Sequence, residues 1–202
     1  MKLFFTPRSP FVRKVRVSII ELGLNDKIDQ QQVDLENPPA ELSEWNPLGK
    51  VPTLVADGRG LFGSQLICEY LDSLGGKVKL FPADGEKRWT ALRRQSIADG
   101  IMEQLSARRH ETKRPAEKQS EKAVVKMKGK SDRGLALLEK EAGLLGPHGQ
   151  CDIGHVAIAC CLGYCDFRFS KEPWREQYPG LAAWYGEFSK RPSMQDTMPP
   201  KE

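Results

Sequence analysis

The chain has 202 residues, of which 39% are hydrophobic and 29% are charged. This composition excludes an intrinsically disordered chain, a collagen or coiled-coil protein and a membrane-embedded protein. No apolar run approaches the ~18 residues that cross a bilayer, and no apolar segment precedes the first Pro and Arg residues. We therefore expect a cytoplasmic protein with no membrane partner, built as one large domain or two small ones.

The formal net charge is +4, from 31 basic and 27 acidic side chains, and the excess is local. Residues 1–80 are neutral, whereas residues 107–133 hold ten basic side chains against four acidic ones. This segment lacks interleaved aromatic residues and carries glutamates between its cations, which is more typical of a solvated helix face than of a nucleic-acid site. We expect no nucleic-acid partner. A narrower alternative is that Arg108, Arg109 or Arg114 attracts anionic substrates.

The cysteines show neither a CxxC pair nor the spacing of a zinc site, so we expect no metal. Four of the five lie in one apolar stretch, where cysteine usually behaves as a small buried hydrophobe in a reducing compartment. They are Cys68, Cys151, Cys160, Cys161 and Cys165.

The first element is a strand over residues 2–5, followed by a turn with two prolines. A helix follows, because Ser9 stands at the N-cap position, Pro10 at the first helical position, and apolar residues then recur at helical spacing until Gly23.

Short strands and helices alternate after this helix. In chain order we expect a weak strand at 28–33, a short helix from 38 to 45, a turn at 46–52, a strand at 53–56, a hairpin turn at 57–60, a returning strand at 61–62 and a helix that Ser64 opens.

Residues 80–84 look like a linker, and strand patterns disappear after residue 86. Helices are predicted at 86–110, 115–142, 152–166 and 179–190, with the clearest break at residues 146–149. The third helix is apolar all round and should be the central one. The fold class is therefore α/β plus all-α, with an N-terminal domain at 1–80 and a helical domain at 86–202.

Ser9 is the first candidate for chemistry. Its hydroxyl and the N–H groups of Phe11 and Val12 lie at the positive end of a helix dipole, where an anion or a thiolate is stabilised. The thiol would come from a ligand, since the first cysteine lies on another helix. The alternative is that Ser9 is simply an N-cap.

Two further positions suit a peptidic ligand. A tight turn with a cis bond before Pro52 would leave the backbone of Val51 ready to pair with an extended peptide. Ser64, at a helix start, would hold a carboxylate, although it too can be a simple cap.

Six segments, taken in chain order, resemble the glutathione S-transferase superfamily, in particular its serine-type bacterial members. These proteins have a thioredoxin-like first domain and an all-helical second domain. The matching segments are 9–15 (SPFVRKV), 46–54 (NPLGKVPTL), 64–71 (SQLICEYL), 152–157 (DIGHVA), 178–185 (YPGLAAWY) and 191–193 (RPS).

The resemblance assigns roles at matching positions. Ser9 would donate a hydrogen bond to the glutathione thiolate, Val51 would pair with the cysteinyl backbone, Pro52 would be the cis-proline and Ser64 would bind the γ-glutamyl carboxylate. Lys50 would reach the glycyl carboxylate. Phe11 would lie at the glutathione site and, with the helix after residue 86, line a second pocket for the electrophile.

Two positions depart from the family pattern. Gly63 stands where the family usually has Glu or Asp to meet the γ-glutamyl ammonium, so binding should be weaker unless a residue such as Asp99 of a partner subunit replaces that acid. His155 stands three residues after the N-cap Asp152, where the family usually has Asp, and we interpret it as structural.

The resemblance implies a homodimeric glutathione transferase of detoxification type, with glutathione as co-substrate and a small electrophile as second substrate. Serine at position 9 favours conjugation or peroxide reduction over thiol-disulfide exchange. The alternative is a non-catalytic protein-interaction or regulatory module of the same fold. A nucleic-acid-associated regulator is a third, weaker alternative.

Overall fold

The computed structural model describes residues 1–76, 78–146 and 151–200. The chain forms two compact units: Met1–Ala83 together with Arg191–Glu202, and Asp84–Lys190. The C-terminal segment, which the sequence analysis places in the second domain, therefore belongs with the first unit.

The first unit is built on a four-stranded mixed sheet in the order β2-β1-β3-β4. β1 is parallel to β2 and antiparallel to β3, and β3 and β4 form a hairpin. The elements of this unit are β1 (Lys2–Phe5), α1 (Pro10–Glu21), β2 (Asp29–Gln32), α2 (Ala40–Trp45), β3 (Thr53–Ala56), β4 (Arg59–Phe62), α3 (Ser64–Ser73) and α9 (Pro192–Gln195). This is the thioredoxin-like arrangement that the sequence predicts.

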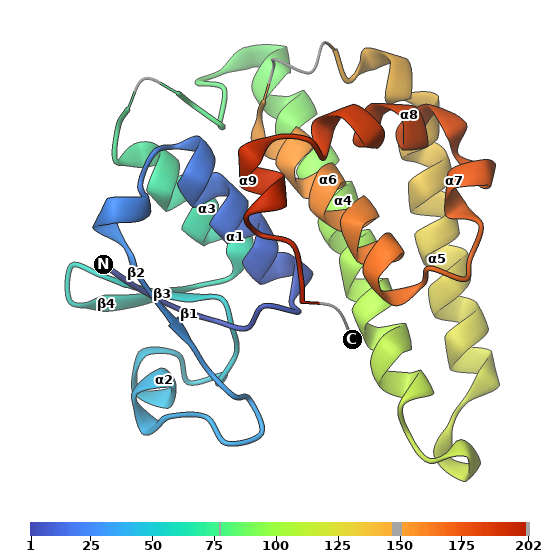
Figure 1. Cartoon of the computed structure of the whole chain (residues 1–202), viewed down its shortest axis with the longest axis horizontal. Helices are drawn as coiled ribbons and strands as arrows, with labels where there is room; N and C mark the ends of the chain where they lie inside the picture. The colour runs from blue at the N-terminus through green and yellow to red at the C-terminus, as the bar shows by residue number, and fades with distance from the viewer. Residues whose placement is uncertain (77, 147–150, 201–202) are drawn as a thin grey trace. The chain divides into compact units, whose positions relative to one another are not determined.

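Helices cover both faces of the sheet, with α1 and α3 on one face and α2 on the other (Figure 1). Leu3 and Phe4 of the inner strand β1 are fully buried because each faces one of these layers. On the α2 side, Phe4 packs with Val33 and Leu42.

The hairpin turn between β3 and β4 is shorter than predicted. Only Asp57 and Gly58 form it, with φ angles of 49° and 72°, which is the two-residue hairpin geometry that matches strand twist. Arg59 and Gly60, expected in the turn, already pair with Ala56 and Val55.

Specific side-chain contacts attach the C-terminal segment to α1. Arg13 donates from Nη2 to the carbonyl oxygen of Met194 at 3.0 Å, and Glu21 pairs with Arg191 at 2.6 Å. Burial raises the pKa of the Glu21 carboxyl, but hydrogen bonds from Arg191 and Ser193 outweigh it, so the pKa lies below its usual value.

The second unit is entirely helical in its described residues. Its helices are α4 (Gly85–Thr112), α5 (Glu121–Lys140), α6 (Ile153–Arg168), α7 (Trp174–Gln177) and α8 (Pro179–Phe188). α6 is buried along residues 153–165, as expected for the central helix. None of the described helices has the length and apolar character needed to span a membrane.

Two helix predictions in this unit need correction. α5 begins at Glu121 and not at residue 115, because Ser120 caps it, with Oγ accepting from the N–H of Ala123 at 3.2 Å. The short helix α7 was not predicted. Of the predicted break at 146–149, only Gly146 lies among the described residues.

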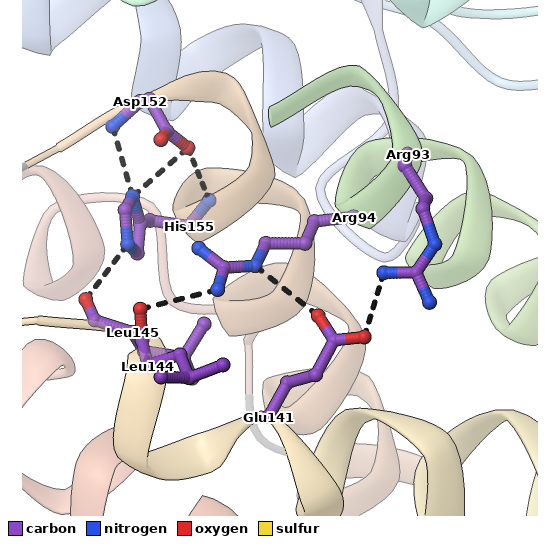
Figure 2. Close-up of polar contacts among 7 residues, drawn as sticks. All are labelled: Arg93, Arg94, Glu141, Leu144, Leu145, Asp152 and His155. Carbon is purple, nitrogen blue, oxygen red and sulfur yellow. Dashed lines mark hydrogen bonds and ion pairs between the residues drawn. The ribbon is translucent and has the colours of Figure 1, made fainter. Parts of the chain in front are cut away.

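Polar contacts hold residues 141–145, which follow α5, against α4 and the start of α6 (Figure 2). Arg94 of α4 donates from Nη2 to the carbonyl oxygen of Leu144 at 3.1 Å, and His155 of α6 bonds from Nε2 to that of Leu145 at 2.8 Å. Glu141 forms an ion pair with Arg93 at 2.6 Å. His155 thus has the structural role predicted for it.

The five cysteines form no disulfide, and all but the half-buried Cys151 are buried. A hydrogen bond with Cys165, together with burial, raises the pKa of the Cys161 thiol well above its usual value. This thiol is therefore protonated at neutral pH. No cluster of metal-binding side chains occurs in the described parts of the chain.

Candidate functional site

Ser9 caps the N-terminus of α1. Its backbone is extended (φ −84°, ψ 126°), and its Oγ accepts a hydrogen bond from the N–H of Val12 at 3.3 Å. The prediction that Val12 offers a free N–H is therefore wrong, because the cap uses that donor. Pro10 has no N–H, so the donors left at this helix start are the Phe11 N–H and the Ser9 hydroxyl proton.

The cap and the donor role of Ser9 are compatible. One lone pair of Oγ accepts the bond from Val12, and the hydroxyl proton remains available for an anion outside the helix. Ser9 lies at the positive end of the α1 dipole, which favours a negative charge at that place. A thiolate brought by a ligand would be stabilised there.

The turn before β3 contains a cis peptide bond between Val51 and Pro52, as the resemblance implies. The side chain of Val51 packs against the core cluster of Phe4, Val33 and Leu42. In the described residues, the N–H and C=O of Val51 make no hydrogen bond with the rest of the chain. They are available to pair with an extended peptide.

A buried amide that the sequence analysis missed holds this turn. Asn46 is 1% exposed, and its Nδ2 donates to the carbonyl oxygen of Lys50 and to Oγ1 of Thr53, both at 2.9 Å. Thr53 also donates from Oγ1 to the Lys50 carbonyl oxygen at 2.7 Å. The available signal was an Asn directly before the turn Pro47-Leu48-Gly49, since Asx side chains commonly bond to nearby backbone.

At the third position, the N-cap of α3 is Gly63 and not Ser64. Ser64 is the first helical residue and is buried, and the first helical hydrogen bond runs from the Ile67 N–H to the Gly63 carbonyl oxygen. Because Gly63 has no side chain to cap the helix, the backbone N–H groups of residues 64–66 are left as donors at the helix start. With the Ser64 hydroxyl they suit a carboxylate.

Strand register brings these three positions to one end of the sheet. Phe4 of β1 pairs with Thr53 of β3, and Thr53 pairs with Phe62 of β4. The chain that leaves β1 toward Ser9, the chain that enters β3 from Pro52 and the chain that leaves β4 toward Gly63 therefore emerge side by side.

Two further predicted site residues, Phe11 and Lys50, stand next to these positions in the chain. Phe11 is half-buried in the first turn of α1, and the side chain of Lys50 is exposed beside the cis bond. The sheet end thus offers two helix starts for anions, one unpaired backbone segment and one cation. This combination suits an extended peptide that carries carboxylates and a thiolate.

The family comparisons match both units. Residues 8–74 match the model of the glutathione S-transferase N-terminal domain, and residues 104–187 match that of the C-terminal domain. The chain belongs to the glutathione S-transferase superfamily. The GST-like protein YibF of Escherichia coli K12 is 33% identical over the whole of both chains.

Solved members of the superfamily have the same fold. A glutathione transferase family member from Pseudomonas fluorescens Pf-5, solved with bound glutathione, is 41% identical over 98% of each chain, with a TM-score of 0.92. A glutathione S-transferase from Methylobacillus flagellatus, also solved with glutathione, is 32% identical over 98% of this chain and 99% of its own, with a TM-score of 0.92.

Proposed function

We propose that this protein is a glutathione transferase that activates the thiol of glutathione for attack on an electrophilic substrate. The observation that carries the proposal is the position of the Ser9 hydroxyl. Its oxygen caps α1, and its proton can be donated to a ligand. It lies at the same end of the sheet as the cis-Pro52 turn and the start of α3. The glutathione in the Pseudomonas and Methylobacillus structures supports the choice of co-substrate.

Each part of glutathione has a counterpart at this sheet end. Ser9 would donate to the thiolate, and the backbone of Val51 would pair with the cysteinyl residue. The N–H groups at the start of α3 and the hydroxyl of Ser64 would hold the γ-glutamyl carboxylate. The ammonium of Lys50 would reach the glycyl carboxylate.

The chemistry follows from serine at position 9. A hydrogen bond to the thiolate lowers the pKa of the thiol, so that more of the nucleophile is ionised at neutral pH. The thiolate then attacks an electrophilic carbon, and the leaving group departs with the bonding pair. Serine cannot form a mixed disulfide, so conjugation, with peroxide reduction as a second reaction, is proposed over thiol-disulfide exchange.

We place this reaction in the cytoplasm, as a detoxification step carried out by a homodimer. The apolar side chains of Phe62 on β4 and Leu66 on α3 are 36% and 53% exposed. Exposed apolar side chains of this kind favour a surface of the first unit that a second subunit covers. Light scattering would test the dimer, and Leu66→Glu should shift the protein toward the monomer.

Calorimetric titration of glutathione, with thiolate absorbance followed against pH, tests the function. We expect saturable binding and a thiol pKa well below ~8.5 in the wild type, and a higher pKa in Ser9→Ala. Ser120→Ala is the matched control, because Ser120 makes the same cap on α5 and should leave the pKa unchanged.

Two results would contradict the proposal. Equal thiol pKa values in the wild type and Ser9→Ala would remove Ser9 as the activating group. No binding at millimolar glutathione would favour a non-catalytic interaction module of the same fold.

A further inference from the structure

A small pocket lies inside the helical unit, between α4, α5 and the segment that follows α6. Leu105, Leu135 and Trp174 form its apolar side, and Arg108 and Lys128 are its cations. Its volume is about 20 Å³. Since one water needs roughly 10–15 Å³, the empty space holds one or two water-sized atoms, and the carboxylate of Glu172 occupies space beside it.

Arg108 is the most unusual residue of this pocket. It is 3% exposed, and its guanidinium carbon lies 3.9 Å from the centre of the Phe169 ring. Its Nη2 is 2.9 Å from Oε1 of Glu172, yet neither Nη2 nor Nε makes a well-aligned hydrogen bond in the described parts of the chain. Two nitrogen atoms of this buried guanidinium therefore lack a well-aligned acceptor, although the carboxylate of Glu172 lies close to one of them.

These two donors belong to one edge of the guanidinium. The Nε–H and one Nη2–H point in parallel, and this edge fits the two oxygens of a carboxylate. The other cation of the pocket, Lys128, is a single ammonium and has no such planar pair of donors. Lys128 already bonds to both carboxylate oxygens of Asp132, at 2.8 Å and 3.0 Å.

The carboxylate of Glu172 competes with an external carboxylate for this edge of the Arg108 guanidinium. Its carboxylate pairs with Arg108, but its side chain is 40% exposed and can turn into water. The four charged residues that line the pocket balance, two basic and two acidic. An external carboxylate would therefore enter most easily as the carboxylate of Glu172 leaves.

We propose that the pocket binds the carboxylate group of a small organic acid on the Nε–Nη2 edge of Arg108, in exchange for the carboxylate of Glu172. The head group would take the space that the carboxylate of Glu172 leaves, and the remainder of the acid would project past the half-exposed side chains of Glu172 and Lys128. The site uses residues of the helical unit only and does not depend on the glutathione chemistry proposed above.

Acetate and butyrate are the probes, titrated into the full-length protein by calorimetry, with the fluorescence of the pocket residue Trp174 as a second readout. Glu172→Gln keeps the shape of the side chain and removes the competing charge, so both acids should bind about tenfold more tightly than to the wild type. Glu187→Gln is the matched control. Glu187 is another glutamate of this unit in an ion pair, at 2.7 Å from Lys190, but it does not line the pocket, so its change should leave binding at the wild-type level.

Removal of the Nε–Nη2 edge of Arg108 should abolish binding of the two acids. In Glu172→Gln/Arg108→Lys the positive charge stays but the paired donors are lost, so the gain of Glu172→Gln should disappear. Circular dichroism and the thermal midpoint show whether each variant is folded, and a double variant that does not fold is replaced by Glu172→Gln/Arg108→Gln.

Absence of saturable acetate and butyrate binding in folded Glu172→Gln overturns the proposal. The same holds if sodium chloride or acetamide gives the same signal, because the effect is then one of ionic strength or of general solvation. Since glutathione binding is measured on the same samples, loss of this pocket and failure of the glutathione site are separate results.

Discussion

His155 and Asp152 exchange hydrogen bonds across the first turn of α6. The Asp152 carboxylate accepts from the backbone N–H of His155 at 3.0 Å, and Nδ1 of His155 lies 3.1 Å from the backbone nitrogen of Asp152. This is a capping box with histidine in the place that Glu or Gln usually takes. Since α6 is the buried centre of the helical unit, the start of this helix matters for the stability of the whole unit.

Removal of the cap should destabilise the protein. Asp152→Ala takes away the acceptor for the His155 N–H, and we expect the free energy of unfolding to fall by about 1 kcal/mol, as for other N-caps. Urea unfolding followed by circular dichroism measures this change. Asp152→Asn keeps an acceptor oxygen and should lose much less, so equal losses in the two variants would contradict a capping role.

The charge of Asp152 predicts a dependence on pH. Burial raises the pKa of its carboxyl, but hydrogen bonds from His155 and Gly154 outweigh burial, so the pKa lies below its ordinary value in the folded protein. The unfolded chain takes up the proton first as the pH falls. The carboxylate therefore stabilises the fold above about pH 4, and this stabilisation is lost as the pH falls through the lower folded pKa.

The variant Asp152→Asn isolates this effect, because asparagine caps without titrating. Between pH 7 and pH 3 the unfolding midpoint of the wild type should fall more steeply than that of Asp152→Asn. Parallel curves for the two proteins would show that Asp152 has the same pKa in both states.

Gly60 should not tolerate a side chain. A Cβ atom at this position would lie 2.0 Å from the carbonyl oxygen of Trp45, which is backbone and cannot turn away. We expect Gly60→Ala to cost about 1–3 kcal/mol, as other overpacked sites do. Gly100→Ala, at a helical position where a Cβ meets nothing within 4 Å, should instead stabilise the protein by about 0.5–1 kcal/mol.

The buried amide of Asn46 gives a prediction on the site itself. Asn46→Ala leaves the Lys50 carbonyl oxygen without one of its two donors, and we expect a loss of about 1–3 kcal/mol in stability together with weaker glutathione binding. Asn37→Ala is the control, because the amide of Asn37 makes a single exposed bond to Asp34 at 3.4 Å. If glutathione binds Asn46→Ala as it binds the wild type, the turn at residues 50–52 does not need this support.

Local features of the fold could be predicted from the sequence, and long-range contacts could not. The Ser9-Pro10 start of α1 follows from the chemistry of adjacent residues, and the cis bond at Pro52 follows from family resemblance. By contrast, the pairing of Glu21 with Arg191 joins residues 170 positions apart, and no periodicity indicates such a pair.

The same distinction between local and long-range features holds for the candidate site. Ser9, Val51 and Ser64 stand at turns and helix starts, which short sequence patterns mark. Their convergence depends on the pairing of Thr53 with both Phe4 and Phe62, and strand register is set by the whole sheet. The use of the Val12 N–H by Ser9 depends on side-chain rotation, which the sequence pattern does not define.

Substitution of Gly63 by Glu tests whether the proposed glutathione site lacks a carboxylate. Its φ is +88°, a left-handed conformation that glycine adopts at no steric cost, and a Cβ there would meet nothing within 4 Å. Gly63→Glu would thus have space for its side chain but a strained backbone. A carboxylate at this position would face the γ-glutamyl ammonium of the proposed ligand, and a charge-assisted hydrogen bond contributes about 1.5–3 kcal/mol.

Gly63→Gln carries the same backbone strain without the charge and is the matched control. We expect Gly63→Glu to bind glutathione about tenfold more tightly than Gly63→Gln in calorimetric titrations at pH 7, whatever both variants lose in thermal stability. The advantage should shrink as the salt concentration rises, because it comes from a charge pair near the surface. Equal affinities of the two variants at low salt would mean that the ammonium group already has an acidic partner elsewhere, and the glycine at position 63 would then leave the site complete.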